Sequence, residues 1–198
     1  MATGGCCGAT PPAHTEIVRY AIPTLLAAVG VVAAPAAAVD VAPRALVLRS
    51  ADVPAGWALD REETGLRTNR DEGGTDKKSR ALIARLGRVT GYQAEWRRGA
   101  MDSIVSRADV FRSTNGARMY LDIAADSLRS SGIKGLRRSP AHLGDLGYVF
   151  GGGPNGTVAW VVWRSGPVAG TVVGWGVPRN TTLALARKQQ RRIAAASG

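Results

Sequence analysis

Hydrophobic and polar residues alternate along several short segments of the chain. In residues 91–98 the apolar positions Tyr92, Ala94 and Trp96 fall on one side and polar residues fall on the other. A period of two residues predicts a strand with one buried side. By the same argument, or from short apolar runs between turn residues, further strands are predicted over 101–111, 146–150, 158–164 and 168–175.

Other segments follow the period of a helix. In residues 116–129, Ala117, Leu121, Ala124 and Leu128 recur at helical spacing, after capping residues at 113–115. Shorter or weaker helical patterns predict helices over 77–86 and 181–196. Residues 61–76 are polar and contain glycine, and we predict an exposed loop there.

The order of these elements predicts the fold class. Short turns at Gly99 and at Ser165–Gly166 join neighbouring strands, which must then run antiparallel. We therefore predict an α+β fold, an antiparallel sheet with helices packed on one face. The order strand, glycine turn, strand, helix occurs twice, over 96–129 and 163–196. A duplicated strand-strand-helix unit explains this, and so does independent use of a common hairpin.

The N-terminal part resembles an export signal. Arg19 precedes an uncharged apolar run from 20 to 34, and Pro35 stands before three alanines. This arrangement predicts a secretory signal peptide cleaved after Ala38. The run is shorter than the roughly 20 residues that a membrane-spanning helix needs. A signal retained as a membrane anchor is the alternative.

Cleavage divides the chain into two parts. Residues 1–38 form the signal peptide, and 39–198 form one exported α+β domain. Residues 1–17 contain no basic residue and fit a signal peptide poorly, so translation starting near Val18 is a further hypothesis. Cys6 and Cys7 precede the apolar run, and the mature domain would therefore fold without disulfides.

Positive charge dominates the composition and increases toward the C-terminus. The formal net charge is +11, and Asp145 is the last acidic residue. In the predicted terminal helix, four cations stand in pairs four residues apart: Arg187, Lys188, Arg191 and Arg192. An exported basic surface of this kind indicates contact with anionic lipid or a cell-wall polymer, and no nucleic acid is expected. A solubilising helix with cations matched to its dipole is the alternative.

Glycines mark a second candidate site on the last predicted strand. Gly170, Gly174 and Gly176 share one of its sides. Glycine in a strand either lets another element pack closely or leaves room for a ligand groove.

The composition excludes several kinds of catalytic site. After cleavage no cysteine and a single histidine, His142, remain, which removes thiol nucleophiles and Cys/His zinc sites. Asp71, Glu72 and Asp76 do not follow the spacing of a calcium loop. We therefore expect no catalytic residue, no cofactor and no metal. A secreted hydrolase that uses paired carboxylates stays open as an alternative.

Short motifs carry a resemblance to known proteins. The segment 48–57, Leu143-Gly144-Asp145 and the segment 162–166 resemble uncharacterised exported proteins and lipoproteins of high-GC Gram-positive bacteria. The chain is also similar in outline to PsbP-like envelope lipoproteins and to the extracellular sensor domains of PknH-type kinases. The resemblance implies an α+β envelope domain without a known activity, and no functional residue is carried over.

These observations together predict an exported, non-catalytic module of the cell envelope that binds a ligand or a partner. Its partner would be anionic lipid, a wall polymer or another envelope protein. The alternatives are the carboxylate hydrolase and a basic surface protein that docks on anionic lipid or wall polymer.

Overall fold

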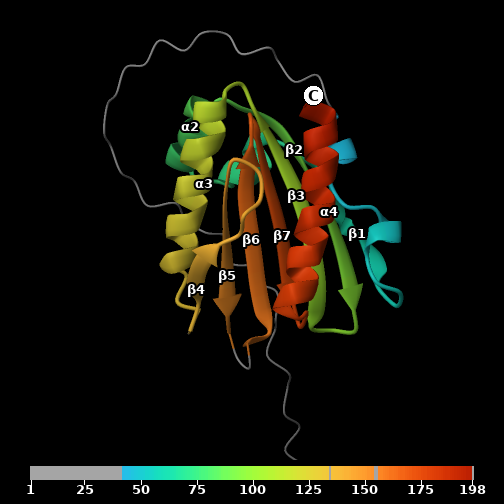
Figure 1. Ribbon diagram of the computed structural model, residues 1–198. Coiled ribbons are helices and arrows are strands. Elements are labelled where there is room, and N and C mark those ends of the chain that lie inside the picture. Colours follow the sequence, from blue (N-terminus) through green and yellow to red (C-terminus); the bar gives the residue numbers. More distant parts are fainter. Residues whose placement is uncertain (1–41, 134, 154–155, 198) are drawn as a thin grey trace, which may run out of the picture.

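The computed structural model describes residues 42–133, 135–153 and 156–197 (Figure 1). The predicted signal peptide and its cleavage site lie outside the described residues. A seven-stranded antiparallel sheet dominates the fold, and its strands across the sheet run in the order β1-β2-β3-β7-β6-β5-β4. Their bounds are β1 (Ala58–Arg67), β2 (Arg88–Arg98), β3 (Asp102–Phe111), β4 (Arg137–Pro140), β5 (Leu146–Gly152), β6 (Val158–Ser165) and β7 (Val168–Trp175).

The helices complete an α+β fold, as the sequence predicts. The described residues form four α-helices and two short 3-10 helices, namely α1 (Asn69–Gly73), α2 (Lys77–Arg85), α3 (Thr114–Arg129), α4 (Arg179–Ser197), η1 (Pro43–Leu46) and η2 (Ser50–Asp52). Ser113 caps α3, since its hydroxyl accepts a hydrogen bond from the Gly116 amide at 3.1 Å. None of the described helices is long and apolar enough to span a membrane.

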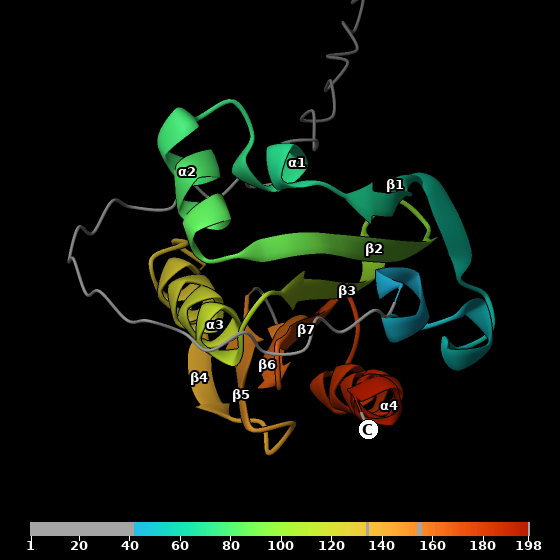
Figure 2. The same ribbon diagram turned by 90° about the horizontal axis from the view of Figure 1, so that it is seen from above.

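The helices cover both faces of the sheet, so the prediction that they pack on one face is wrong. On β6, Val161 packs in a cluster with Leu185 and Ile193 of α4. The next residue, Val162, points the opposite way and packs with Leu121 of α3. Figure 2 shows α3 and α4 on opposite sides of the sheet, with α1 and α2 near the β1–β2 end.

This placement also bears on the hypothesis of a duplicated unit. The order strand-strand-helix does occur twice, as β2-β3-α3 and β6-β7-α4. The two hairpins meet through antiparallel β3 and β7. A two-fold axis perpendicular to the sheet would relate such hairpins and would place both helices on the same face. Because α3 and α4 lie on opposite faces, no such symmetry relates the two units.

The segment predicted as an exposed loop, 61–76, is largely regular structure. Because it contains most of β1 and all of α1, the prediction of an exposed loop is wrong. Among the described strands, β1 pairs only with β2, and its register shifts between Asp60 and Gly65. Thr68 then caps α1 and accepts a hydrogen bond from the Asp71 amide.

The opposite edge of the sheet is a strand that the sequence does not reveal. β4 has four residues and ends at Pro140, and within the described part of the chain its one partner is β5. Its sequence reads as a basic connection because Arg137 and Arg138 are both exposed. The two edges of the sheet are therefore an irregular strand and a very short one.

The largest apolar cluster lies between the sheet and α4. Trp163 and Trp96 are its largest side chains, with exposures of 0% and 1%. η1 adds Leu46 to this cluster, which fixes the start of the described chain to the same face. Smaller clusters lie under α2 and α3 on the other face.

Candidate functional site

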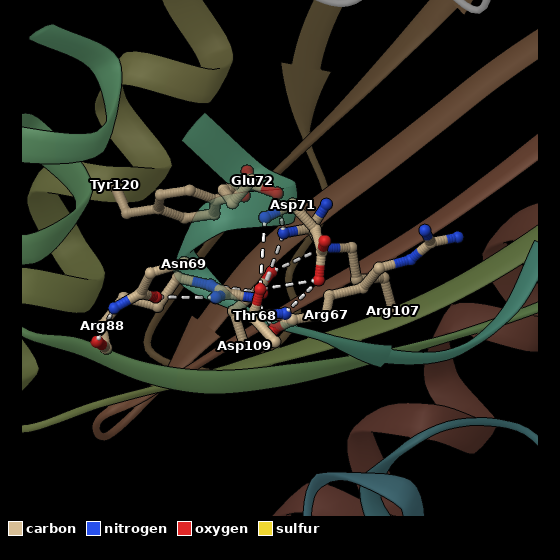
Figure 3. A network of polar contacts seen from close by, with 9 residues as sticks. All are labelled: Arg67, Thr68, Asn69, Asp71, Glu72, Arg88, Arg107, Asp109 and Tyr120. Carbon is tan, nitrogen blue, oxygen red and sulfur yellow. Dashed lines mark hydrogen bonds and ion pairs between the residues drawn. The ribbon is translucent and has the colours of Figure 1, made fainter. Parts of the chain in front are cut away.

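A buried polar network lies on the α3 side of the sheet (Figure 3). Its centre is the Asp109 carboxylate of β3, whose side chain is 1% exposed. Oδ1 of Asp109 accepts hydrogen bonds from Nη2 and Nε of Arg88 at 2.6 and 2.9 Å. Oδ2 accepts one from Nε of Arg107 at 2.8 Å. One carboxylate thus holds two guanidinium groups.

Helix α1 closes the network from outside the sheet. The Glu72 carboxylate pairs with the Arg107 guanidinium and accepts a hydrogen bond from the Tyr120 hydroxyl of α3 at 2.8 Å. Oδ1 of Asn69 accepts a hydrogen bond from Arg88 at 2.8 Å, and its amide donates to the Arg88 carbonyl at 2.9 Å. The network therefore joins α1, β2, β3 and α3.

The charges of this network balance. Two guanidinium groups face two carboxylates, as a buried cluster of ions requires. Burial by itself would raise the pKa of Asp109, but the Arg107 and Arg88 guanidinium groups outweigh burial and hold that pKa below its usual range. Its carboxylates and guanidinium groups pair with one another, so the network is structural.

Tyr120 allows a test of that structural role. Tyr120→Phe is expected to lower the free energy of unfolding by roughly 1 kcal/mol, because Glu72 loses one hydrogen-bond donor but keeps Arg107. Urea unfolding measures the change. The matched control is Tyr148→Phe, since the Tyr148 hydroxyl makes no hydrogen bond to another described residue; Arg138 stacks on its ring. Equal effects of the two substitutions would contradict the role of Tyr120.

The basic side of α4 forms an open hollow of about 340 Å³ against η2. Its lining residues are Asp52, Lys188, Arg191, Arg192 and Ala195. Three of the four cations that the sequence singles out therefore meet in one place. The fourth, Arg187, is exposed on α4 and does not line the hollow.

Two of these cations hold η2 against α4. Nζ of Lys188 donates to the Asp52 carbonyl at 2.8 Å, and Nη2 of Arg192 donates to Oδ2 of Asp52 at 2.6 Å. Burial would raise the pKa of Asp52, but the Arg49 amide and the Arg192 guanidinium lower it overall. Arg191 has no ion pair with any described residue. The hollow thus keeps an excess of positive charge after Asp52 is counted.

The glycines of the last strand are enclosed by neighbouring side chains. A Cβ atom at Gly170 would lie 2.5 Å from Cε2 of Trp163, and one at Gly174 would lie 2.9 Å from Cβ of Val177. Gly176 follows β7 with a φ of 65°, where a Cβ would meet the Asp102 carboxylate. Packing within the protein occupies these positions, and we propose no groove along them.

The acidic residues of 71–76 have structural partners instead of a common ligand. Asp71 completes the cap of α1, Asp76 caps α2, and Glu72 belongs to the buried network. Within the described ranges, no group of His, Cys, Asp or Glu residues is arranged to hold a metal ion. His142 is exposed in the connection between β4 and β5.

Sequence reasoning missed the buried network. Arg107 and Asp109 are two residues apart in a predicted strand, which places both side chains on one face. That spacing is the available signal, but charged residues in a strand are usually assigned to solvent.

Comparison with known proteins yields a likeness in fold alone. No family model matches the chain, and no curated protein matches it. Among solved structures, the chain is similar to the extracellular domain of PknH from Mycobacterium tuberculosis, with a TM-score of 0.47 and 12% sequence identity. The match covers 78% of this chain and 97% of that domain. This is a weak resemblance of outline, and it assigns no residue a role.

Proposed function

We propose that the protein is an exported, non-catalytic module of the cell envelope that binds an anionic partner through the basic side of α4. The hollow lined by Lys188, Arg191 and Arg192 carries this proposal. Cations gathered on one part of the surface raise the local concentration of anions. Arg191 is exposed there and free of any ion pair with a described residue, so its guanidinium is available to a partner.

Two further observations support the proposal. The apolar run after Arg19 and the alanines at 36–38 favour export. The most deeply buried carboxylate, that of Asp109, is held by Arg88 and Arg107, which keep its pKa below the usual range. A carboxylate held in this way is poorly placed for general acid or base catalysis, which favours a binding role.

Charge substitutions in the hollow test the binding site. Arg191→Glu is expected to weaken binding to an anionic probe at least about fivefold, because each cation near an anionic surface contributes about 1 kcal/mol. Asp52→Asn is expected to strengthen binding, because a repelling carboxylate leaves the hollow, while it lowers stability by releasing Arg192. Both effects should shrink as salt rises. The measurement is binding of the purified protein to long-chain polyphosphate and its sedimentation with phosphatidylglycerol vesicles.

The control is Arg85→Glu on α2, on the other face of the sheet. This substitution changes the net charge by the same amount as Arg191→Glu. It should bind nearly as well as the unaltered protein. Equal losses in Arg85→Glu and Arg191→Glu would mean that total charge, and not the hollow, governs binding. Absence of binding to both probes at low salt would refute the proposed function.

A further inference from the structure

The exposed cations of α4 extend far beyond the hollow. Arg179, Arg187 and Arg191 are separated by multiples of four residues, so they follow a row that turns by about 120° around the helix axis. Leu183 stands in this row between Arg179 and Arg187 and packs against the core. With a rise of 1.5 Å per residue, the row from Arg179 to Arg191 is about 18 Å long. The sequence of α4 contains no acidic residue, so no carboxylate of the helix itself interrupts the row.

Beside the first turn of α4, a cation of the sheet, Arg137, lies on the same face as Arg179. Nη2 of Arg179 donates to the Ser139 hydroxyl of β4 at 3.0 Å, and the Arg179 side chain passes over Gly151 of β5. Arg137 is the register partner of Gly151, so its side chain stands on the same face of the sheet. Neither Arg137 nor Arg179 pairs with a carboxylate among the described residues, and both are exposed.

We propose that these residues form one continuous track for an extended, phosphate-bearing polymer. The track consists of Arg137, Arg179, Arg187, Arg191 and the hollow of Lys188 and Arg192. This inference rests on the proposed function and names the class of its partner. Guanidinium groups match phosphate oxygens in pairs. A polymer that reaches several of them at once binds far more tightly than a single phosphate group, because its later contacts form within the complex.

The packing of α4 favours a polymer over a membrane surface. A helix that docks on lipid inserts apolar side chains into the interface. On α4, Leu185, Ala186 and Ile193 are buried against the sheet, with exposures of 3%, 0% and 0%, and Leu183 is half-buried against the same cluster. The exposed apolar residues of α4 are alanines, which are too small to anchor a helix in lipid. The large hydrophobic residues that are exposed in the described chain, such as Met101 and Trp175, lie outside α4. The helix therefore offers charge to a partner but no apolar anchor.

The length of the anion distinguishes a track from a single hollow. The experiment compares binding of tripolyphosphate and long-chain polyphosphate, each at the same concentration of phosphate groups. We expect the long chain to bind at least about tenfold more tightly and with a steeper dependence on salt, because it neutralises more cations. Arg179→Glu and Arg137→Glu should each weaken binding of the long chain at least about fivefold and leave tripolyphosphate binding unchanged. Arg191→Glu should weaken both.

Three outcomes would contradict the proposal of a continuous track. Equal affinity for the short and long probes would confine binding to the hollow and leave the proposed function intact. Loss of tripolyphosphate binding in Arg137→Glu, which lies outside α4, would mean that the variant acts through the fold or the total charge. Binding to phosphatidylglycerol vesicles without binding to polyphosphate would identify lipid as the partner. Arg85→Glu serves again as the control of equal charge.

Discussion

Asp109→Asn is expected to lower the free energy of unfolding by about 3–5 kcal/mol, because it leaves buried guanidinium charge without its counter-ion. The Arg88 side chain is 0% exposed, and Asp109 is its carboxylate partner in the structure. Arg107 keeps Glu72, which is why the loss should fall mainly on Arg88. Urea unfolding at neutral pH measures the change.

The surface pair of Asp126 and Arg129 supplies the control. Asp126 is 66% exposed and also lies within salt-bridge distance of an arginine, so Asp126→Asn should change stability by less than about 0.5 kcal/mol. A loss of similar size in both variants would show that the buried network is no more important than a surface pair.

The stability of the protein should also depend on pH through Asp109. Its pKa is lower in the folded protein than in the unfolded chain, where a value of about 3.9 is usual. The folded state therefore gains stability above the unfolded pKa and loses it as the pH falls toward the folded one. Asp109→Asn should show a shallower fall in stability below about pH 4 than the unaltered protein.

Gly170→Ala is expected to lower stability by about 1–3 kcal/mol, the usual effect of overpacking a core. The new methyl group would overlap the indole ring of Trp163, which is fully buried between the sheet and α4. The ring cannot move outward without displacing other core residues. Thermal unfolding followed by circular dichroism measures the loss.

Gly65→Ala is the matched control for Gly170→Ala. A Cβ at Gly65 would meet nothing within 4 Å, and Gly65 is not among the glycines with positive φ. This substitution should leave stability within about 0.5 kcal/mol of the unaltered protein. If Gly170→Ala were equally harmless, the last strand would have more space beside Trp163 than the packing indicates, and the groove hypothesis would return.

The fold was predictable where local patterns and burial agree. The alternation around Trp96, the stripe ending at Leu128 and the turn at Gly99 each determine an element within a few residues, and the structure contains all three. The capping hydroxyl of Ser113 is equally local, since it binds an amide three residues away.

The sequence also indicates that helices cover both faces of the sheet, through an apolar run in one strand. Residues 158–163 of β6 are Val-Ala-Trp-Val-Val-Trp, an apolar run without alternation. Such a run is typical of a strand buried on both faces. It therefore indicates helices on both sides of the sheet, which is what α3 and α4 provide.

Other features depend on contacts between distant parts of the chain. β1 contains Asp60, Arg61, Glu62, Glu63 and Arg67, and as an edge strand it buries too little to show an apolar side. The burial of the network depends on α1, whose Asn69 and Glu72 bind Arg88 and Arg107 from distant parts of the chain. The hollow likewise requires Asp52 to meet a helix more than a hundred positions away. No local pattern contains these contacts.

The two outer strands affect how copies of the protein meet one another. An exposed sheet edge can template the addition of a strand from a neighbouring molecule, which begins aggregation. β1 interrupts its ladder between Asp60 and Gly65 and exposes Arg61 and Glu62 near the interruption. β4 is short, carries two arginines and ends at a proline. Both edges therefore discourage stacking into fibrils, so the sheet can remain a discrete unit even where many copies are crowded together.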